Sequence, residues 1–194
     1  MANLPKIALG AWAWGNDGTF GNNLTAESLK PIFDTAMENG LNLWDTAYAY
    51  GMGTSEKVLA GFLEGLPRES YLISDKFTPQ CADASSASAM KDMIEMQLGL
   101  MDLNRFDVYW IHNVSSAPKW TEELAKYFEG KDNVPLLGVS NFHTWFLSRE
   151  HCQASMIQSI LCRKALQGQR SIILYLISWR SLMKSLRNLQ TNMV

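Results

Sequence analysis

Short apolar runs alternate with segments of helical period along the first 142 residues, and this alternation limits the fold more than any other feature of the sequence. The expected strands are 7–9, 41–44, 71–74, 106–111 and 135–139, and the expected helices are 25–38, 54–63, from Ser86 or Ser88 to about 100, and 121–128. Strand–helix alternation at this spacing builds right-handed βαβ units and a parallel sheet. The pattern therefore predicts an α/β fold, either a doubly wound sheet or a (β/α)₈ barrel.

Two of the expected helices carry clear local signals. The apolar positions at the spacing of a buried helix face in 25–38 are Leu29, Ile32, Phe33 and Ala36. In the helix 54–63, Glu56 falls in the first turn, where a carboxylate interacts favourably with the helix dipole. Both segments are thus predicted to be helices that cover the sheet.

Polar residues at the strand ends favour the barrel over the doubly wound sheet. No GxGxxG follows the first strand, where a dinucleotide-binding sheet would carry it. Instead, Asp45 follows the second strand, Lys76 the third, His112 the fourth and Ser140-Asn141 the fifth. In a (β/α)₈ barrel the carboxyl ends of the strands form one rim, which holds the active site. We therefore predict a TIM-barrel type fold, of which about the first five βα units are present.

The residue types at this rim suit proton donation to a carbonyl group. An Asp beside a Lys keeps both groups charged, and the ammonium of Lys76 next to a phenol predicts a lowered pKa for Tyr50. Such a phenol is a better general acid near neutral pH, and His112 is placed to orient a substrate oxygen. Because no side chain can supply a hydride, a nicotinamide cofactor is expected.

Five motifs in this order resemble the aldo/keto reductase family. They are Gly10–Gly15 (GAWAWG), Trp44–Gly61 (WDTAYAYGMGTSEKVLAG), Ile73–Phe77 (ISDKF), Asp107–His112 (DVYWIH) and Gly138–Phe142 (GVSNF). The resemblance implies a (β/α)₈ barrel that reduces aldehydes or ketones with NADPH.

The resemblance also implies a role for each matching residue. Tyr50 would be the general acid, Lys76 and Asp45 its tuning pair, and His112 the residue that orients the substrate. Beyond these catalytic residues, Ser140 and Asn141 would hold the carboxamide of NADPH or NADP, and Trp14 would line the substrate pocket. No metal site is expected.

The segment 143–194 differs from the rest of the chain. The last 44 residues contain no acidic residue but six Lys and Arg, although the whole chain has 19 acidic residues and a formal net charge of −2. We expect residues 1–142 to form the N-terminal part of the barrel and 143–194 to be a tail without a family match in this reading frame. Codon degeneracy allows the tail to encode reductase-like sequence in another frame, which predicts a deletion with a frameshift. The apolar run 172–179 is expected to promote aggregation.

Composition excludes several classes of protein. A hydrophobic content of 47% and the low net charge exclude general disorder, and the lack of basic excess argues against nucleic acid as a partner. No segment is long and apolar enough to predict a membrane span, and three cysteines without metal-ligand spacing favour the cytoplasm. The oligomeric state stays open. Two alternatives to an active reductase remain, a catalytically dead truncated fragment that binds at most a partner or nucleotide, and a metal-dependent barrel hydrolase.

Overall fold

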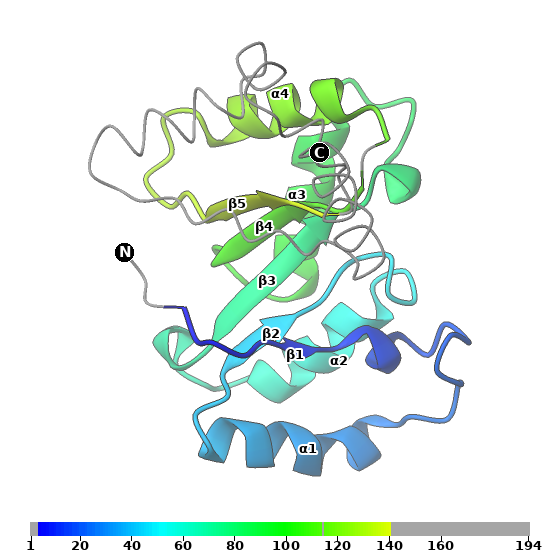
Figure 1. The fold of residues 1–194 in the computed structure, drawn as a ribbon, viewed down its shortest axis with the longest axis vertical. Helices are drawn as coiled ribbons and strands as arrows, with labels where there is room; N and C mark the ends of the chain where they lie inside the picture. Colours follow the sequence, from blue (N-terminus) through cyan, green and yellow to red (C-terminus); the bar gives the residue numbers. More distant parts are fainter. Residues whose placement is uncertain (1–3, 114, 141–194) are drawn as a thin grey trace, which may run out of the picture.

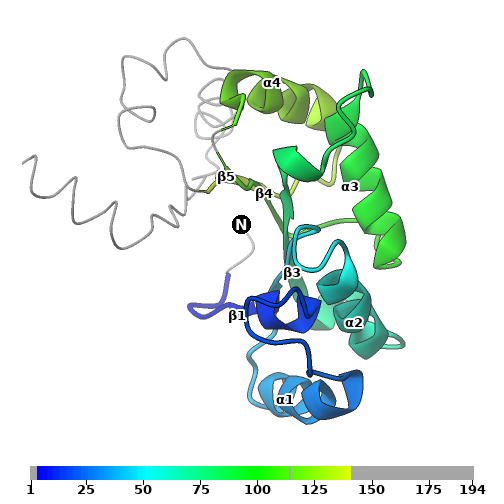
Figure 2. The same cartoon turned by 90° about the vertical axis from the view of Figure 1, so that its right-hand side faces the viewer.

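A computed structural model describes residues 4–113 and 115–140, and these form one parallel sheet with helices packed on one of its faces (Figures 1 and 2). The strands are β1 (Leu9–Gly10), β2 (Leu43–Asp45), β3 (Leu72–Phe77), β4 (Val108–Ile111) and β5 (Leu136–Val139). The helices are α1 (Ala26–Glu38), α2 (Thr54–Leu63), α3 (Ala89–Leu100) and α4 (Ala117–Phe128), with short 3₁₀ turns at Trp12–Gly15, Arg68–Ser70 and Pro79–Cys81.

The order of the strands decides between the two predicted architectures. All neighbouring strands are parallel, and their order in the sheet, β1-β2-β3-β4-β5, is their order in the sequence. A doubly wound sheet reverses its strand order at a switch point, whereas successive units of a (β/α)₈ barrel continue in one direction. The predicted barrel-type arrangement of the first five units is therefore confirmed.

The hydrophobic core lies between the sheet and its helices. Trp44 of β2 is 1% exposed, stacks on Phe33 of α1 with ring centroids 4.9 Å apart, and contacts Trp14 at 5.2 Å. Because side chains alternate along a strand, Ile73, Asp75 and Phe77 of β3 face the helices, and Ile73 and Phe77 join this core. The alternation leaves Lys76 on the face of the sheet away from the helices.

Several details differ from the sequence predictions. Strand β1 is Leu9–Gly10 and not 7–9, and β2 includes Asp45, which was predicted to follow it. The strand β3 extends to Phe77, so Lys76 lies within it and not after it. Helix α4 begins at Ala117, four residues before the predicted start, because a proline is accepted in the first turn of a helix. Ile32 is 57% exposed, since the buried stripe of α1 is narrower than its apolar pattern indicates.

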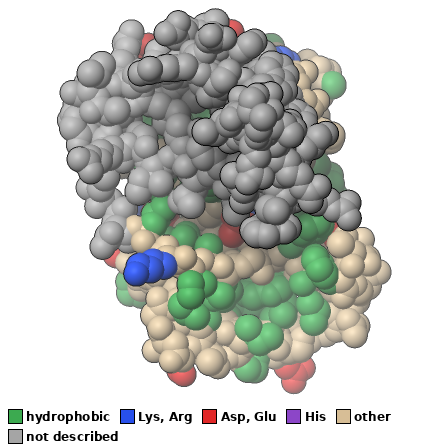
Figure 3. Space-filling model, in the orientation of Figure 1, with side chains coloured by type: hydrophobic (Ala, Val, Ile, Leu, Met, Phe, Trp, Pro, Cys, Tyr) green, Lys and Arg blue, Asp and Glu red, His purple; other side chains and the backbone are tan. Residues whose placement is uncertain are grey.

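Hydrophobic side chains are exposed in the lower part of the face that Figure 3 shows. Among the described residues, the large hydrophobic side chains with substantial exposure are Ile7, Trp12, Phe20, Ile32, Met52, Leu66 and Met96. Among the residues that the structure describes, no helix has the length and apolar character needed to cross a membrane. Asn141, the segment 143–194 and the run 172–179 fall outside the described residues.

Candidate active site

Lys76 is the centre of a cluster of polar side chains at the carboxyl ends of β2 and β3. Its Nζ donates hydrogen bonds to Asp45 Oδ2 at 2.6 Å and to the main-chain oxygen of Thr46 at 2.7 Å. The same ammonium lies 4.8 Å from the ring centroid of Tyr50. The side chain of Lys76 is only 3% exposed and that of Asp45 20%. The structure thus brings together three of the residues that the sequence singled out.

A chain of hydrogen bonds on the same face of the sheet holds the second oxygen of Asp45. Ser74 Oγ donates to Asp45 Oδ1 at 2.6 Å, and Trp110 Nε1 donates to Ser74 Oγ at 2.8 Å. An indole N–H can only donate, so the hydroxyl proton of Ser74 is directed to Asp45. Gly138 makes room for the indole, because a Cβ there would lie 2.3 Å from the Trp110 ring.

Sequence reasoning missed Ser74 and Trp110. A signal was present, because Ser74 is two residues before Lys76 and so shares its face of the strand. The indole of Trp110 reaches Ser74 only because β3 and β4 pair with Lys76 opposite Trp110.

Two glycines fix the loop that carries Tyr50. Gly51 has φ of +69°, and a Cβ on it would lie 2.0 Å from the main-chain oxygen of Gly15. A Cβ on Gly15 would in turn lie 2.5 Å from the carbonyl of Tyr50. The main chain of the turn Trp12–Gly15 can therefore contact the main chain of the Tyr50 loop. This contact fixes the loop from which the Tyr50 ring lies against the Lys76 ammonium.

The structure separates the roles of the two tryptophans in this turn. Trp14, predicted to line the substrate pocket, is 5% exposed and packs in the core against Trp44 and Phe62. Trp12 is 42% exposed and stacks on Tyr50, with ring centroids 5.3 Å apart and planes 13° apart. The position of Trp14 thus disagrees with the predicted role. Residues two apart in a 3₁₀ turn point in different directions, which the sequence pattern did not reveal.

The ring of His112 also contacts Tyr50. The two rings meet edge to face with centroids 5.8 Å apart, and His112 Nδ1 is 2.9 Å from the hydroxyl oxygen of Thr78. Ser140, at the end of β5, is 6% exposed, and its main-chain N–H donates to Ile111 O, one strand away. Ser140 therefore shares the rim with His112, as its position in the sequence predicted.

Burial controls the protonation of these groups. Burial raises the pKa of Tyr50 above its ordinary value of 10.0, and this outweighs the lowering effect of the Lys76 charge. The predicted downward shift of the Tyr50 pKa is therefore wrong. Burial works against the charge of Lys76, but Asp45 and Tyr50 outweigh it and raise the pKa of the ammonium. Burial, aided by the positive charge of Lys76, lowers the pKa of His112 to about 4, so the imidazole is neutral at pH 7.

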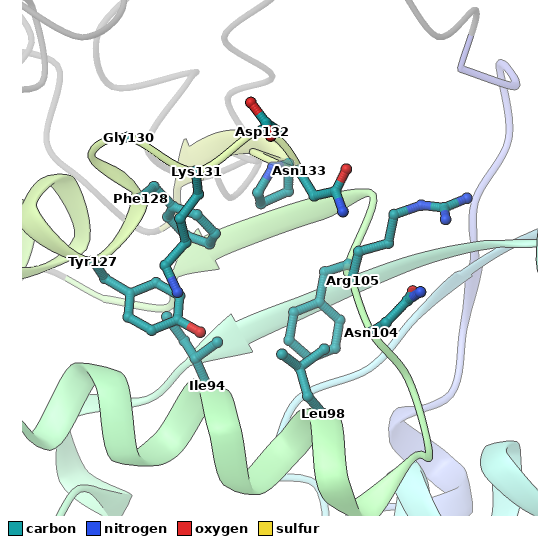
Figure 4. Close-up of a pocket in the computed structure, with 12 residues that line it drawn as sticks. Ile94, Leu98, Asn104, Arg105, Tyr127, Phe128, Gly130, Lys131, Asp132 and Asn133 are labelled. Atoms are coloured by element: carbon teal, nitrogen blue, oxygen red, sulfur yellow. The ribbon is translucent and has the colours of Figure 1, made fainter.

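Other parts of the described structure are weaker candidates for a site. A cleft of about 370 Å³ opens between α3, α4 and the segments that lead into β4 and β5 (Figure 4). It lies at the amino ends of the strands, away from the rim that barrel enzymes use. Lys131 extends over the Tyr127 ring, with its Nζ 3.8 Å from the centroid. Within 4–113 and 115–140, no three His, Cys, Asp or Glu side chains gather as metal ligands would.

Comparisons with known proteins agree with this geometry. The model of the aldo/keto reductase family matches residues 6–159. The chain is 31% identical over 172 residues to a chloroplastic pyridoxal reductase of Arabidopsis thaliana, a match that covers 77% of this chain and 45% of that protein. It is also 31% identical over 110 residues to an aldo-keto reductase of Gibberella moniliformis, covering 54% of this chain and 33% of the relative.

A solved structure shares the fold. An aldo-keto reductase of Klebsiella pneumoniae in complex with NADPH superposes with a TM-score of 0.59 at 24% identity, covering 78% of this chain and 49% of that one. The chain thus spans less than half the length of these relatives. The family match covers most of the sequence, and the strand order agrees with the fold of that solved structure. The chain belongs to the aldo/keto reductase family.

Proposed function

We propose that this site reduces aldehydes or ketones by hydride transfer from NADPH, with Tyr50 as the general acid. The observation that carries the proposal is the placement of the Tyr50 ring over Lys76, whose ammonium is held by Asp45 and Thr46. When a carbonyl accepts a hydride, its oxygen gains negative charge and needs a proton. Tyr50 is protonated at pH 7 and can supply one.

Lys76 makes the loss of that proton easier in the reaction than in the resting site. As the proton leaves Tyr50, the ammonium faces a phenolate that it stabilises directly, and Asp45 keeps the ammonium in place. A buried, pre-oriented charge acts strongly because little water is present to screen it. The raised resting pKa of Tyr50 is thus compatible with its role as an acid.

Neutral His112 is suited to orient the carbonyl oxygen. With the Thr78 hydroxyl as donor to Nδ1, the imidazole carries its proton on Nε2 and can donate it to a substrate. A protonated imidazole would instead add a second positive charge beside Lys76, and the lowered pKa of His112 avoids this.

The described rim fits a nicotinamide cofactor in its donor set. Ser140 supplies a buried hydroxyl one strand from His112, and we propose that it holds the carboxamide together with Asn141. The bound cofactor supplies the hydride, which none of these side chains can provide. Trp12, stacked on Tyr50 and partly exposed, is the aromatic wall against which a small, flat carbonyl substrate would pack. We further propose that the protein works in the reducing cytoplasm.

The test of this function compares Tyr50→Phe with Tyr48→Phe in aldehyde-dependent oxidation of NADPH. Loss of the acid should reduce kcat by about 10²–10⁴-fold, whereas Tyr48→Phe, in the same loop, should keep it within about twofold. Unchanged turnover in Tyr50→Phe would remove Tyr50 from the role.

We propose as a second candidate a catalytically dead reductase fragment that binds at most a partner or nucleotide. The chain spans less than half the length of the relatives that it matches. Titration of NADPH fluorescence separates the two candidates. Micromolar binding with aldehyde-dependent turnover supports the reductase, and a folded protein without turnover supports the fragment.

A further inference from the structure

A group of fully buried polar side chains lies on the face of β3 opposite to Lys76. Its members, each 0% exposed, are Glu56 of α2, Asp75 of β3, Gln97 of α3 and Tyr109 of β4. They occupy the layer between the sheet and the helices, where apolar side chains are the rule. Two acidic groups in such a layer need a specific compensation, because burying a charge is costly.

Gln97 sets the direction of the hydrogen bonds in this group. Its amide Nε2 donates to Glu56 Oε1 at 3.1 Å and to Asp75 Oδ1 at 3.0 Å, while its Oε1 accepts from the Tyr109 hydroxyl at 2.6 Å. Asp75 Oδ1 also accepts the main-chain N–H of Lys76 at 2.7 Å. One oxygen of each carboxyl group thus has a donor within hydrogen-bond distance, and the same Gln97 amide nitrogen also lies 3.1 Å from the main-chain oxygen of Lys76.

The other oxygen of each carboxyl group has no donor. Glu56 Oε2 and Asp75 Oδ2 are buried and lack a hydrogen-bond partner if both groups are ionised. The two carboxyl groups nevertheless meet at one atom, because the Gln97 amide nitrogen donates to an oxygen of each. A single proton placed between them turns one orphaned acceptor into a donor for the other and removes one of two buried charges.

We propose that Glu56 and Asp75 share one proton at neutral pH, so that the pair carries one negative charge and anchors the part of β3 that presents Lys76. The two acids are positioning residues, since they act through the strand and do not face the rim. Two carboxyl groups that are fully buried and meet at one amide nitrogen cannot both ionise readily, which is the physical basis of such sharing.

The surroundings of the pair agree with one retained charge. Burial raises the pKa of Asp75 well above its ordinary value, and the charge of Glu56 raises it further. Burial also raises the pKa of Glu56, against the opposing charges of Lys76 and Lys57. The other titratable groups that interact electrostatically with the pair are Tyr50, Cys81 and Tyr109. The ammonium of Lys76 already donates to Asp45 and to the main-chain oxygen of Thr46, so it is paired with another carboxylate.

The shared proton has a measurable consequence for folding. In the unfolded chain both carboxyl groups are ionised above about pH 5, so folding takes up one proton. Because the folded pKa of the protonated acid is raised, the stability that it contributes is complete below about pH 4 and is lost as the pH rises through the folded pKa. The catalytic consequence, a fixed Lys76, rests on the proposed function, whereas the folding measurement does not.

The experiment measures the unfolding equilibrium constant of the full chain between about pH 5 and 7 for the wild type and for Asp75→Asn. The amide can donate to Glu56 Oε2 without a proton from solvent. The ratio of the wild-type constant to that of the variant should therefore rise about tenfold for each pH unit. Substitution of the exposed acid Glu69→Gln, the control, should leave the wild-type slope unchanged. Parallel slopes for the wild type and Asp75→Asn would overturn the proposal.

A second measurement does not depend on the variant. In carbon-detected NMR of the folded wild type, one side-chain carboxyl should keep the chemical shift of a protonated acid at pH 7. Glu56→Gln should remove that signal. A wild-type spectrum in which every carboxyl is ionised at pH 7 would overturn the proposal, whether or not the protein reduces carbonyls.

Discussion

Substitution of Lys76 by methionine tests whether the buried ion pair behaves as its geometry implies. Methionine preserves most of the volume and removes only the ammonium. The Asp45 carboxylate then loses its counter-ion and keeps the hydrogen bond from Ser74. Breaking a buried pair costs about 3–5 kcal/mol, because the remaining charge stays uncompensated. Since Asp45 keeps 20% exposure and its bond to Ser74, we expect a value near the lower limit, about 3 kcal/mol.

The assay is urea unfolding followed by tryptophan fluorescence, and it includes a matched pair. The double variant Lys76→Met/Asp45→Asn also removes the uncompensated charge of the Asp45 carboxylate. It should be more stable than Lys76→Met by at least about 1 kcal/mol. Lys30→Met, which breaks the exposed Lys30–Asp34 pair, should cost less than about 0.5 kcal/mol. Equal costs for Lys76→Met and Lys30→Met, or a double variant less stable than Lys76→Met, would refute this reasoning.

Gly138→Ala should cost about 1–3 kcal/mol in the same assay, because its Cβ would lie 2.3 Å from the Trp110 ring. Gly61→Ala, at an open position of α2, should instead raise stability by about 0.5–1 kcal/mol. The NMR titration of His112 should have its midpoint near pH 4; its contribution to stability is complete above about pH 6.5 and is lost as the pH falls towards 4. A midpoint near 6.5 would contradict the burial of this ring. Trp12→Ala should raise KM for flat carbonyl substrates more than it lowers kcat, and an unchanged KM would separate Trp12 from the substrate site.

The site residues on strand ends could be predicted because the geometry of a parallel sheet is regular. The carboxyl ends of successive strands share an edge, so Asp45, Lys76 and His112 had to lie close together once the fold was predicted. A polar residue at the end of each successive strand was enough to predict that these side chains lie together. By contrast, Trp12 and Trp14 lie in a short 3₁₀ turn, where neither the strand period nor the α-helical period applies.

Glu56 shows a different limit of sequence reasoning. Its place in the first turn of a helix predicted only a favourable interaction with the helix dipole, and its position in α2 is as predicted. Its burial depends on how α2 and α3 pack on β3, which brings Gln97 and Asp75 to it from distant parts of the sequence. No local pattern encodes such a meeting of three elements.

The sequence by itself determined the alternation of strands and helices, the parallel sheet, the family and the set of residues at the rim. The alternation, the sheet and the rim depend on local periodicity and on regular strand geometry, whereas the family rests on the resemblance of five motifs in order. Only the tertiary structure decided the protonation of the site residues and the hydrogen bonds that hold their side chains in place. The directions of the Tyr50 and His112 pKa shifts follow from burial, and the Glu56–Asp75 pair is buried between the sheet and its helices. The Ser74–Trp110 hydrogen bond follows from the register between β3 and β4. Burial depends on the packing of residues far apart in the chain, and the removal of water there sets the cost of each charge.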